Sequence, residues 1–335
     1  MKQKQTVFSR LIIAASVVLT AVLFVSNVDA AVKKVIRRID GAVVNKNEQN
    51  LWPIAVMIDN HPAARPQSGL SQASVVYEAV AEGGIPRFMA FFATSTKIPF
   101  IGPVRSTRPY FVRFAAEYRA ALAHAGGSPD GLILLNSLRM PNVEGVSGKT
   151  AKFFFRYGGS GVHNLYTNST QLAAALKFFK YDKYKPTYRS WLFKTEPKLA
   201  GRATGNHGAE IDLGGGASFK IKYQYNRKTN SYLRFTGGRA HIDRLTKKQL
   251  APKNVVIMLV PKEKVLDRKG RLEIKTLGSG KAILMKDGRA MTLKWKKTSP
   301  YGRTMFTTLK NKEIEFNRGS VWIEVVPAGH KYKLF

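Results

Sequence analysis

Two arginines close to a predicted helix start are the most distinctive chemical feature of this sequence. Arg105 and Arg108 directly precede an apolar pattern with helical spacing. The first turn of a helix exposes free backbone N–H groups, and guanidinium groups form strong charge-assisted hydrogen bonds. Together these groups predict a site for a phosphate, sulfate or carboxylate. The alternative is that both arginines pair internally with Asp59, Glu78 or Glu82.

A histidine and a serine lie shortly after these arginines. A short apolar strand over 120–123 is expected to end at His124, and Ser128 precedes Pro129 at the next predicted helix. The pair has the residue types of a base and a nucleophile. However, Asp130 occupies the place of the second glycine of a G-x-S-x-G elbow. Ser128 also fits the N-cap of the helix, with Ser106 or Thr107 as the cap of the preceding one.

The remaining candidates are polar residues in predicted loops and at strand ends. His163 and Asn164 follow a glycine-rich loop, and Asp59 ends a short buried strand. Asp59 and Glu82 also have the chemistry of a glycosidase carboxylate pair. No local spacing supports a metal site, so no metal or cofactor is predicted, and catalytic residues stay unassigned. The predicted ligand-binding set is Asp59, Arg65, Glu82, Arg105, Arg108, His124, Ser128, His163 and Asn164.

The charge of the chain restricts the partners that its surface attracts. Its 335 residues include 55 Lys and Arg against 21 Asp and Glu, which gives a net charge of +34. Such a surface attracts polyanions, including anionic envelope polymers, acidic membranes and, without specificity, nucleic acids. The sequence contains no cysteine, which excludes disulfides, thiol nucleophiles and lipid attachment to a cysteine.

The N-terminus indicates export. Three basic residues precede an apolar run over 11–25, and Ala30 ends a stretch with the small residues of a cleavage site. We predict a signal peptide over 1–30, with an uncleaved membrane anchor as the alternative. Both interpretations place the rest of the chain outside the cytoplasm, secreted or held at the cell envelope.

The rest of the chain is predicted to be an α+β protein of two domains. Residues 31–50 are weakly patterned and are interpreted as a tether. Residues 51–200 combine apolar strands with amphipathic helices, which predicts a mixed α/β sheet domain. Residues 201–335 form many short strands with turns between them, and Asp287-Gly288 is a strong hairpin signal. This spacing predicts a mostly antiparallel β domain, either a sandwich or a barrel.

The order of several motifs resembles the YerB-like family of bacterial extracytoplasmic proteins, which are often lipoproteins. The resemblance covers roughly residues 51–327. It rests on Met57–Asn60, Arg65–Leu70, Val76–Glu78, Glu82–Ile85, Arg87-Phe88, Ile101–Ser106, Arg108, Gly126–Pro129, His163-Asn164, Asn254–Val256, Gly278–Gly280, Asp287-Gly288 and Val321–Ile323. It implies paired N- and C-terminal domains of unknown function and supplies no reaction. The lack of a cysteine departs from the lipoprotein pattern.

Three functions are compatible with these observations. The first is a binding or scaffold protein of the envelope, with an anion or glycan pocket in the N-terminal domain and a polymer or protein partner. The second is a hydrolase of envelope glycan or phosphodiester, with His124 or a carboxylate as base. The third is a nucleic-acid-binding protein, because basic strands with aromatic residues, such as those around Trp295, can bind single-stranded nucleic acid. The favoured interpretation of these strands is a solvated sheet face with a packed tryptophan.

Overall fold

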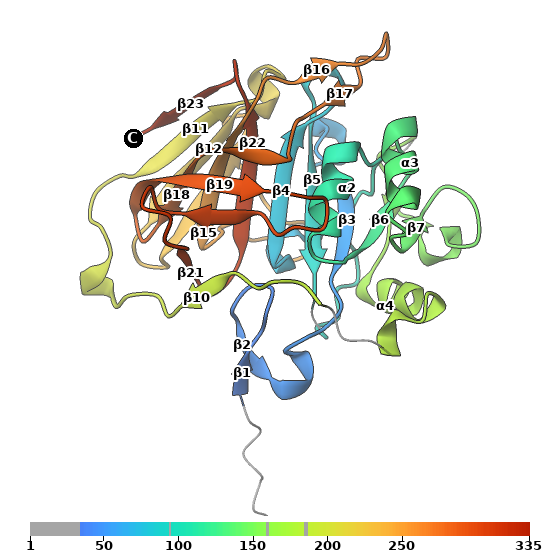
Figure 1. Ribbon diagram of the computed structural model, residues 1–335, viewed down its shortest axis with the longest axis horizontal. Helices are drawn as coiled ribbons and strands as arrows, with labels where there is room; N and C mark the ends of the chain where they lie inside the picture. Colours follow the sequence, from blue (N-terminus) through green and yellow to red (C-terminus); the bar gives the residue numbers. More distant parts are fainter. Residues whose placement is uncertain (1–33, 94, 159–160, 184–186) are drawn as a thin grey trace, which may run out of the picture. The chain divides into compact units, whose positions relative to one another are not determined.

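A ten-stranded sheet contains strands from both halves of the chain (Figure 1). The computed structural model describes residues 34–93, 95–158, 161–183 and 187–335. The predicted signal peptide or anchor, 1–30, lies outside them. In spatial order the strands are β20 (Met305–Thr307), β19 (Arg289–Lys297), β18 (Gly278–Lys286), β15 (Asn254–Val260), β22 (Val321–Pro327), β4 (Val75–Val80), β5 (Pro86–Phe92), β3 (Ile54–Asp59), β6 (Ala121–His124) and β7 (Asn142–Glu144).

A second, five-stranded sheet is antiparallel throughout. Its order is β14 (Arg239–Ala240), β13 (Ser231–Thr236), β12 (Ile221–Asn226), β11 (Gly208–Asp212) and β23 (Lys331–Leu334). Four two-stranded pairs complete the strands: β1 (Lys34–Ile36) with β2 (Val43–Asn45), β8 (Phe155–Arg156) with β9 (Leu165–Tyr166), β10 (Leu192–Lys194) with β21 (Glu315–Asn317), and β16 (Lys264–Val265) with β17 (Leu272–Glu273).

The α-helices of the described residues are α2 (Pro109–Ala116), α3 (Pro129–Ser137) and α4 (Ser169–Phe178). As predicted, Ser128 caps α3, because its Oγ accepts a hydrogen bond from the Gly131 N–H at 3.2 Å. The predicted cap of α2 is wrong. Arg108 is its N-cap residue, and no side chain caps it, since Pro109 fixes the first helical position two residues beyond Thr107.

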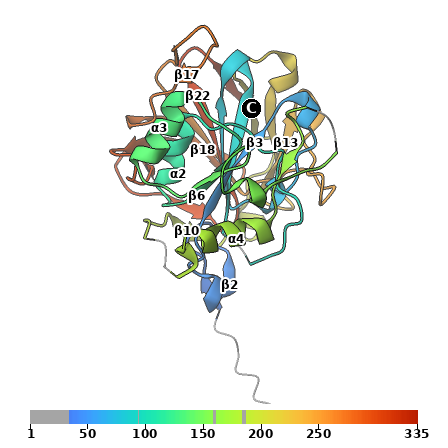
Figure 2. The same ribbon diagram turned by 90° about the vertical axis from the view of Figure 1, so that its right-hand side faces the viewer.

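The ten-stranded sheet is covered on both faces, which explains its continuously apolar strands. On one face, Phe114 of α2 stacks on Tyr77 of β4 with ring centroids 4.2 Å apart. On the other face, Tyr223 and Arg234 of the five-stranded sheet contact the neighbouring Glu324 and Glu78. Figure 2 shows α2 and α3 on one side of β3 and β13 on the other.

The C-terminal half is not a separate sandwich or barrel, which corrects the prediction. Its strand β22 pairs in parallel with β4 of the N-terminal half, from Val321 opposite Val75 to Val325 opposite Ala79. Both strands are buried along their length and satisfy each other's backbone groups. Residues 34–50, predicted as a tether, also contain strands, and Ile39 is 1% exposed within the core.

Two buried ionic centres join the halves, one on each face of this sheet. In the first, Arg234 donates to Glu78 at 2.5 Å and to Glu324 at 3.0 Å, and all three side chains are fully buried. In the second, Glu117 after α2 accepts hydrogen bonds from Lys297 at 2.9 Å and from Arg303. Within the described ranges, no helix has both the length and the apolar character needed to cross a membrane.

We predict that Arg234→Met lowers the free energy of unfolding by about 3–5 kcal/mol, because it leaves two buried carboxyl groups without their cation. Urea denaturation followed by circular dichroism measures this loss. Arg239→Met is the control, since Arg239 is an exposed residue three positions beyond the end of the same hairpin strand. Its effect is expected to stay within about 0.5 kcal/mol. Equal losses in both variants would contradict a special role for Arg234.

Acid unfolding tests the second centre. Burial alone would raise the pKa of Glu117, but Lys297 and Arg303 offset this and hold the pKa below 4.5. A carboxyl whose folded pKa is depressed stabilises the fold above its unfolded pKa and loses this contribution as the pH falls. The stability gap between the native protein and Glu117→Gln is therefore expected to be widest at neutral pH and to narrow below pH 4.5. Glu315→Gln, at an exposed position, should differ little from the native protein in free energy of unfolding at every pH. A difference for Glu117→Gln that widens in acid would contradict the lowered pKa of Glu117.

Candidate functional site

The predicted residues Asp59, Arg105 and His163 meet at the carboxyl end of β3. An isolated bridge between Ile58 and Val104 places Arg105 beside the end of the strand. Arg105 Nε lies 3.1 Å from Asp59 Oδ2, and His163 Nδ1 lies 2.7 Å from the same oxygen. Asp59 is buried, while about a quarter of each partner side chain is exposed. The site thus occupies the edge at which open α/β sheets bind ligands.

His163 has the orientation of an imidazole in acid–base chemistry. Its Nδ1 contacts the buried Asp59 carboxylate, and its ring stacks on His61 with centroids 4.6 Å apart. A carboxylate in this position fixes the tautomer and leaves Nε2 as the reactive nitrogen. Among the described residues, however, no serine or threonine hydroxyl hydrogen-bonds His163. The contact therefore orients a histidine without supplying a protein nucleophile.

Glu82, Arg87 and Arg108 form a second group at this edge. Arg108 Nη2 donates to Glu82 at 2.6 Å, and Arg87 Nη2 donates to the same carboxylate at 3.2 Å. Burial and the neighbouring Arg108 lower the pKa of Arg87 to about 10, against the opposing effect of Glu82. Both arginines of the predicted anion site are consequently held by carboxylates, Arg105 by Asp59 and Arg108 by Glu82. An incoming anion at this edge has to compete with them.

His124, Ser128 and Asn164 are held by other protein groups. The His124 ring is fully buried, with Nδ1 2.9 Å from the Gly126 carbonyl and Nε2 2.8 Å from Asn142 Oδ1. Ser128 caps α3, and Asn164 Oδ1 accepts from Arg156 at 2.6 Å. The structure therefore uses His124 and Ser128 to position backbone at the β6–α3 turn. Among the described residues, no three His, Asp or Glu side chains converge as ligands for a metal.

Arg65, the remaining predicted residue, lines a cavity of about 520 Å³ between the two halves of the chain. One wall is the turn after β3, with Pro62 and Pro66, and the other is the hairpin that connects β13 to β14. Arg65 donates to the Asn60 carbonyl at 2.9 Å and to the Ser218 carbonyl at 2.7 Å. These bonds fix the guanidinium in place, yet no ion pair within 4 Å neutralises it among the described residues.

The polar groups of this cavity favour an anion. The backbone of Arg239 pairs with Thr236 across the hairpin, but its exposed side chain makes no hydrogen bond or ion pair within the described ranges. Thr236 is only 6% exposed, and its Oγ1 has no hydrogen-bond partner there. No aspartate or glutamate lies among the residues that line the cavity. Two arginines and a hydroxyl group are donors suited to a phosphate or carboxylate, and no carboxylate that lines the cavity competes for them.

A buried network supports the wall that carries Arg65. His241 at the cavity accepts a hydrogen bond from Arg234 through Nδ1 at 3.1 Å and donates through Nε2 to Gln67 at 2.8 Å. Burial, with Arg234 and Arg65 nearby, lowers the pKa of His241 well below 6.5, so the ring is neutral. Gln67 in turn donates to Asn60 Oδ1 at 3.3 Å, and Asn60 contacts Arg65. The first ionic centre and the cavity thus belong to one hydrogen-bonded system.

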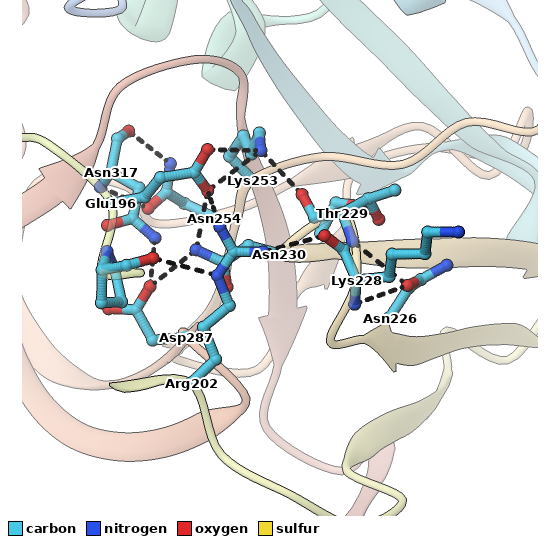
Figure 3. Close-up of polar contacts among 12 residues, drawn as sticks. Glu196, Arg202, Asn226, Lys228, Thr229, Asn230, Lys253, Asn254, Asp287 and Asn317 are labelled. Carbon is cyan, nitrogen blue, oxygen red and sulfur yellow. Dashed lines mark hydrogen bonds and ion pairs between the residues drawn. The ribbon is translucent and has the colours of Figure 1, made fainter. Parts of the chain in front are cut away.

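Other polar features of the C-terminal half are structural. Asp287 accepts hydrogen bonds from Asn230 and Asn317, while Glu196 joins Asn230 to Lys253 (Figure 3). These contacts hold the two hairpin turns together. Trp295, which the nucleic-acid alternative would use as an aromatic platform, is instead the packed tryptophan that the sequence favours: it is 1% exposed and its Nε1 donates to the Leu259 carbonyl. It presents no ring face for base stacking.

Sequence reasoning missed Thr236, Arg239 and His241. The only local signal was the pair of glycines between Thr236 and Arg239, which predicts a tight turn but no ligand. These residues face Arg65 only because the five-stranded sheet packs on β4 and β22. No spacing in the sequence records that contact.

Thr236→Val tests whether the Thr236 hydroxyl is a spare donor. An unpartnered buried hydroxyl costs stability, so its replacement by a methyl group should leave the free energy of unfolding unchanged or raise it by up to about 1 kcal/mol. Thr304→Val is the matched control, because Thr304 Oγ1 donates to Glu117 at 2.6 Å. That variant is expected to lose about 1.5–3 kcal/mol in urea denaturation. A similar loss for Thr236→Val would show that its hydroxyl already has a partner.

Comparisons with known proteins show the same two-part arrangement. Residues 40–182 match the family described as "Protein of unknown function (DUF3048) N-terminal domain", and residues 210–323 match its C-terminal domain. A protein of Bacillus subtilis (strain 168) named "Putative lipoprotein YerB" is 33% identical over 287 residues, which is 84% of each chain. The crystal structure of YerB protein from Bacillus subtilis is 30% identical, with a TM-score of 0.78 over 90% of this chain and all of that one.

Proposed function

We propose a function from the premise that this chain belongs to the YerB-like family with paired DUF3048 domains. The protein is an extracytoplasmic envelope protein that binds an anionic ligand between its two halves. The observation that carries this proposal is the cavity lined by Arg65 and Arg239 and by no carboxylate. The envelope location is supported by the name of the Bacillus subtilis relative and by the basic and apolar N-terminus.

The cavity is built to bind rather than to convert its ligand. Arg65 is fixed by three hydrogen bonds to Asn60 and Ser218, and His241 is neutral with both ring nitrogens used. Neither group is then available to transfer a proton to a ligand. Fixed donors bind an anion without the entropic cost of ordering flexible side chains. This arrangement supports a binding role over hydrolysis.

The net positive charge of the protein also attracts anions, so a test has to distinguish binding in the cavity from non-specific attraction to the surface. Arg239→Gln removes one positive charge from the cavity, and Arg268→Gln removes one from an exposed loop outside it. The full-length protein, titrated with inorganic phosphate at moderate salt in a calorimeter, provides the dissociation constant for each variant. Salt screens the long-range contribution of the surface.

Arg239→Gln is expected to weaken phosphate binding about tenfold or more, because a charge-assisted hydrogen bond contributes about 1.5–3 kcal/mol. Arg268→Gln should leave the dissociation constant within about twofold, since a single remote surface charge is screened. Equal weakening in both variants, or no saturable binding in the native protein, would overturn the proposal.

A further inference from the structure

A basic groove adjoins the cavity that contains Arg65 and Arg239. It has a volume of about 840 Å³ and runs beside β11, β12 and β23 of the five-stranded sheet. Gly237 belongs to the walls of both spaces, and the neighbouring residues Ala217 and Ser218 line the groove and the cavity respectively. The two spaces are therefore separated by only one turn of backbone.

Gly237 allows the backbone between the groove and the cavity to pack closely. Its φ of +56° is one that residues with side chains rarely adopt, and a Cβ there would lie 2.9 Å from the Ser218 carbonyl oxygen. Its N–H donates to the Lys220 carbonyl at 2.9 Å, which holds the turn against β12. The hairpin can approach the 217–220 segment closely because no side chain intervenes.

The groove has more positive than negative charge. Four lysines line it, Lys220, Lys222, Lys331 and Lys333, against the carboxylates of Glu210 and Asp212. The one ion pair between these groups, Lys222 to Glu210, spans 3.9 Å and is about half exposed, so it contributes little. Among the described residues, Lys220, Lys331 and Lys333 have no carboxylate within 4 Å. They are available to an external anion.

The lysines also form a row. Lys331 and Lys333 project to the same side of β23, at the spacing of alternate strand residues, which is about 7 Å. Glu210 of β11 is paired with Lys222 of β12 on one side and with Lys333 of β23 on the other, so these lysines lie on the same face of the sheet, on the two strands that flank β11. A row of cations that begins next to a cavity with two arginines fits a ligand whose negative charges repeat along a chain.

We propose that the cavity and the groove together bind a linear polymer with repeating phosphate groups, with one phosphate between Arg65 and Arg239 and the following ones along the groove lysines. This inference rests on the proposed function and specifies its ligand class. A neutral glycan would leave the lysines without partners. A single-stranded nucleic acid would need a stacking platform for each successive base, and the aromatic rings that line the groove are those of the neighbouring residues Tyr332 and His330.

Chain length is the variable that tests this inference. Orthophosphate, tripolyphosphate and long-chain polyphosphate are titrated into the full-length protein at moderate salt. The native protein should bind tighter as the chain lengthens. A triple variant carries Lys222→Gln, Lys331→Gln and Lys333→Gln. Its affinity for orthophosphate should stay within about twofold of the native value, whereas its affinity for long-chain polyphosphate should fall by tenfold or more. Each lost charge pair removes a fraction of a kcal/mol to about 1 kcal/mol of binding free energy.

A matched control carries the same charge change at exposed lysines outside the groove, Lys269→Gln with Lys275→Gln and Lys310→Gln. It should retain the length-dependent gain. The slope of log affinity against log salt for the long chain should also fall in the groove variant, by about 0.7 for each phosphate contact removed, and not in the control. Thermal melts confirm that both triple variants fold.

The outcomes separate this inference from the proposed function. In one outcome, orthophosphate binding depends on Arg239, but affinity does not rise with chain length or rises equally in both triple variants. The polymer inference then fails and the single-anion site stands. If orthophosphate does not bind, the proposed function fails as well. Tighter binding of oligothymidylate than of polyphosphate with the same number of phosphates would instead assign the groove to nucleic acid.

Discussion

The buried arginine between two glutamates, Arg234 with Glu78 and Glu324, is the interaction on which the arrangement of this protein depends. Glu78 and Glu324 are directly opposite each other on parallel strands from different halves of the chain. Burial raises the pKa of Glu78 well above its usual value, and the neighbouring Glu324 adds to this shift against the opposing effect of Arg234. Arg234 supplies the positive charge that lies between these two carboxyl groups. Charges are tolerated in such an interior only when they are paired and hydrogen-bonded in this way.

This requirement explains why the halves form one unit. Glu78 and Glu324 can both reach Arg234 only when β22 lies beside β4 and the five-stranded sheet covers both strands. Glu117 imposes a similar condition on the opposite face, because its partners Lys297 and Arg303 come from the C-terminal half. Apolar strands alone would permit several pairings, whereas a wrong pairing here leaves buried charges without partners.

The same network extends to the candidate ligand site. Arg234 contacts His241, His241 contacts Gln67, and Gln67 and Asn60 hold the segment that carries Arg65. The donors of the cavity are thus positioned before any ligand arrives. By contrast, Arg105 and Arg108, the arginines nearest a helix start, are engaged by Asp59 and Glu82. An arginine without a carboxylate is the better candidate for an external anion, which moves the proposed pocket from the N-terminal half to the junction.

The sequence by itself determined the features that depend on near neighbours in the chain. The helices, the Ser128 cap and the Asp287-Gly288 hairpin follow from local patterns, and the ordered motifs were sufficient to identify the family. The tertiary structure alone decided that β22 pairs with β4 and that Arg65 faces Thr236 and Arg239. These contacts join residues far apart in the chain, and their energy comes from burying specific pairs of charged and polar groups. Local spacing carries no information about which distant group completes each pair.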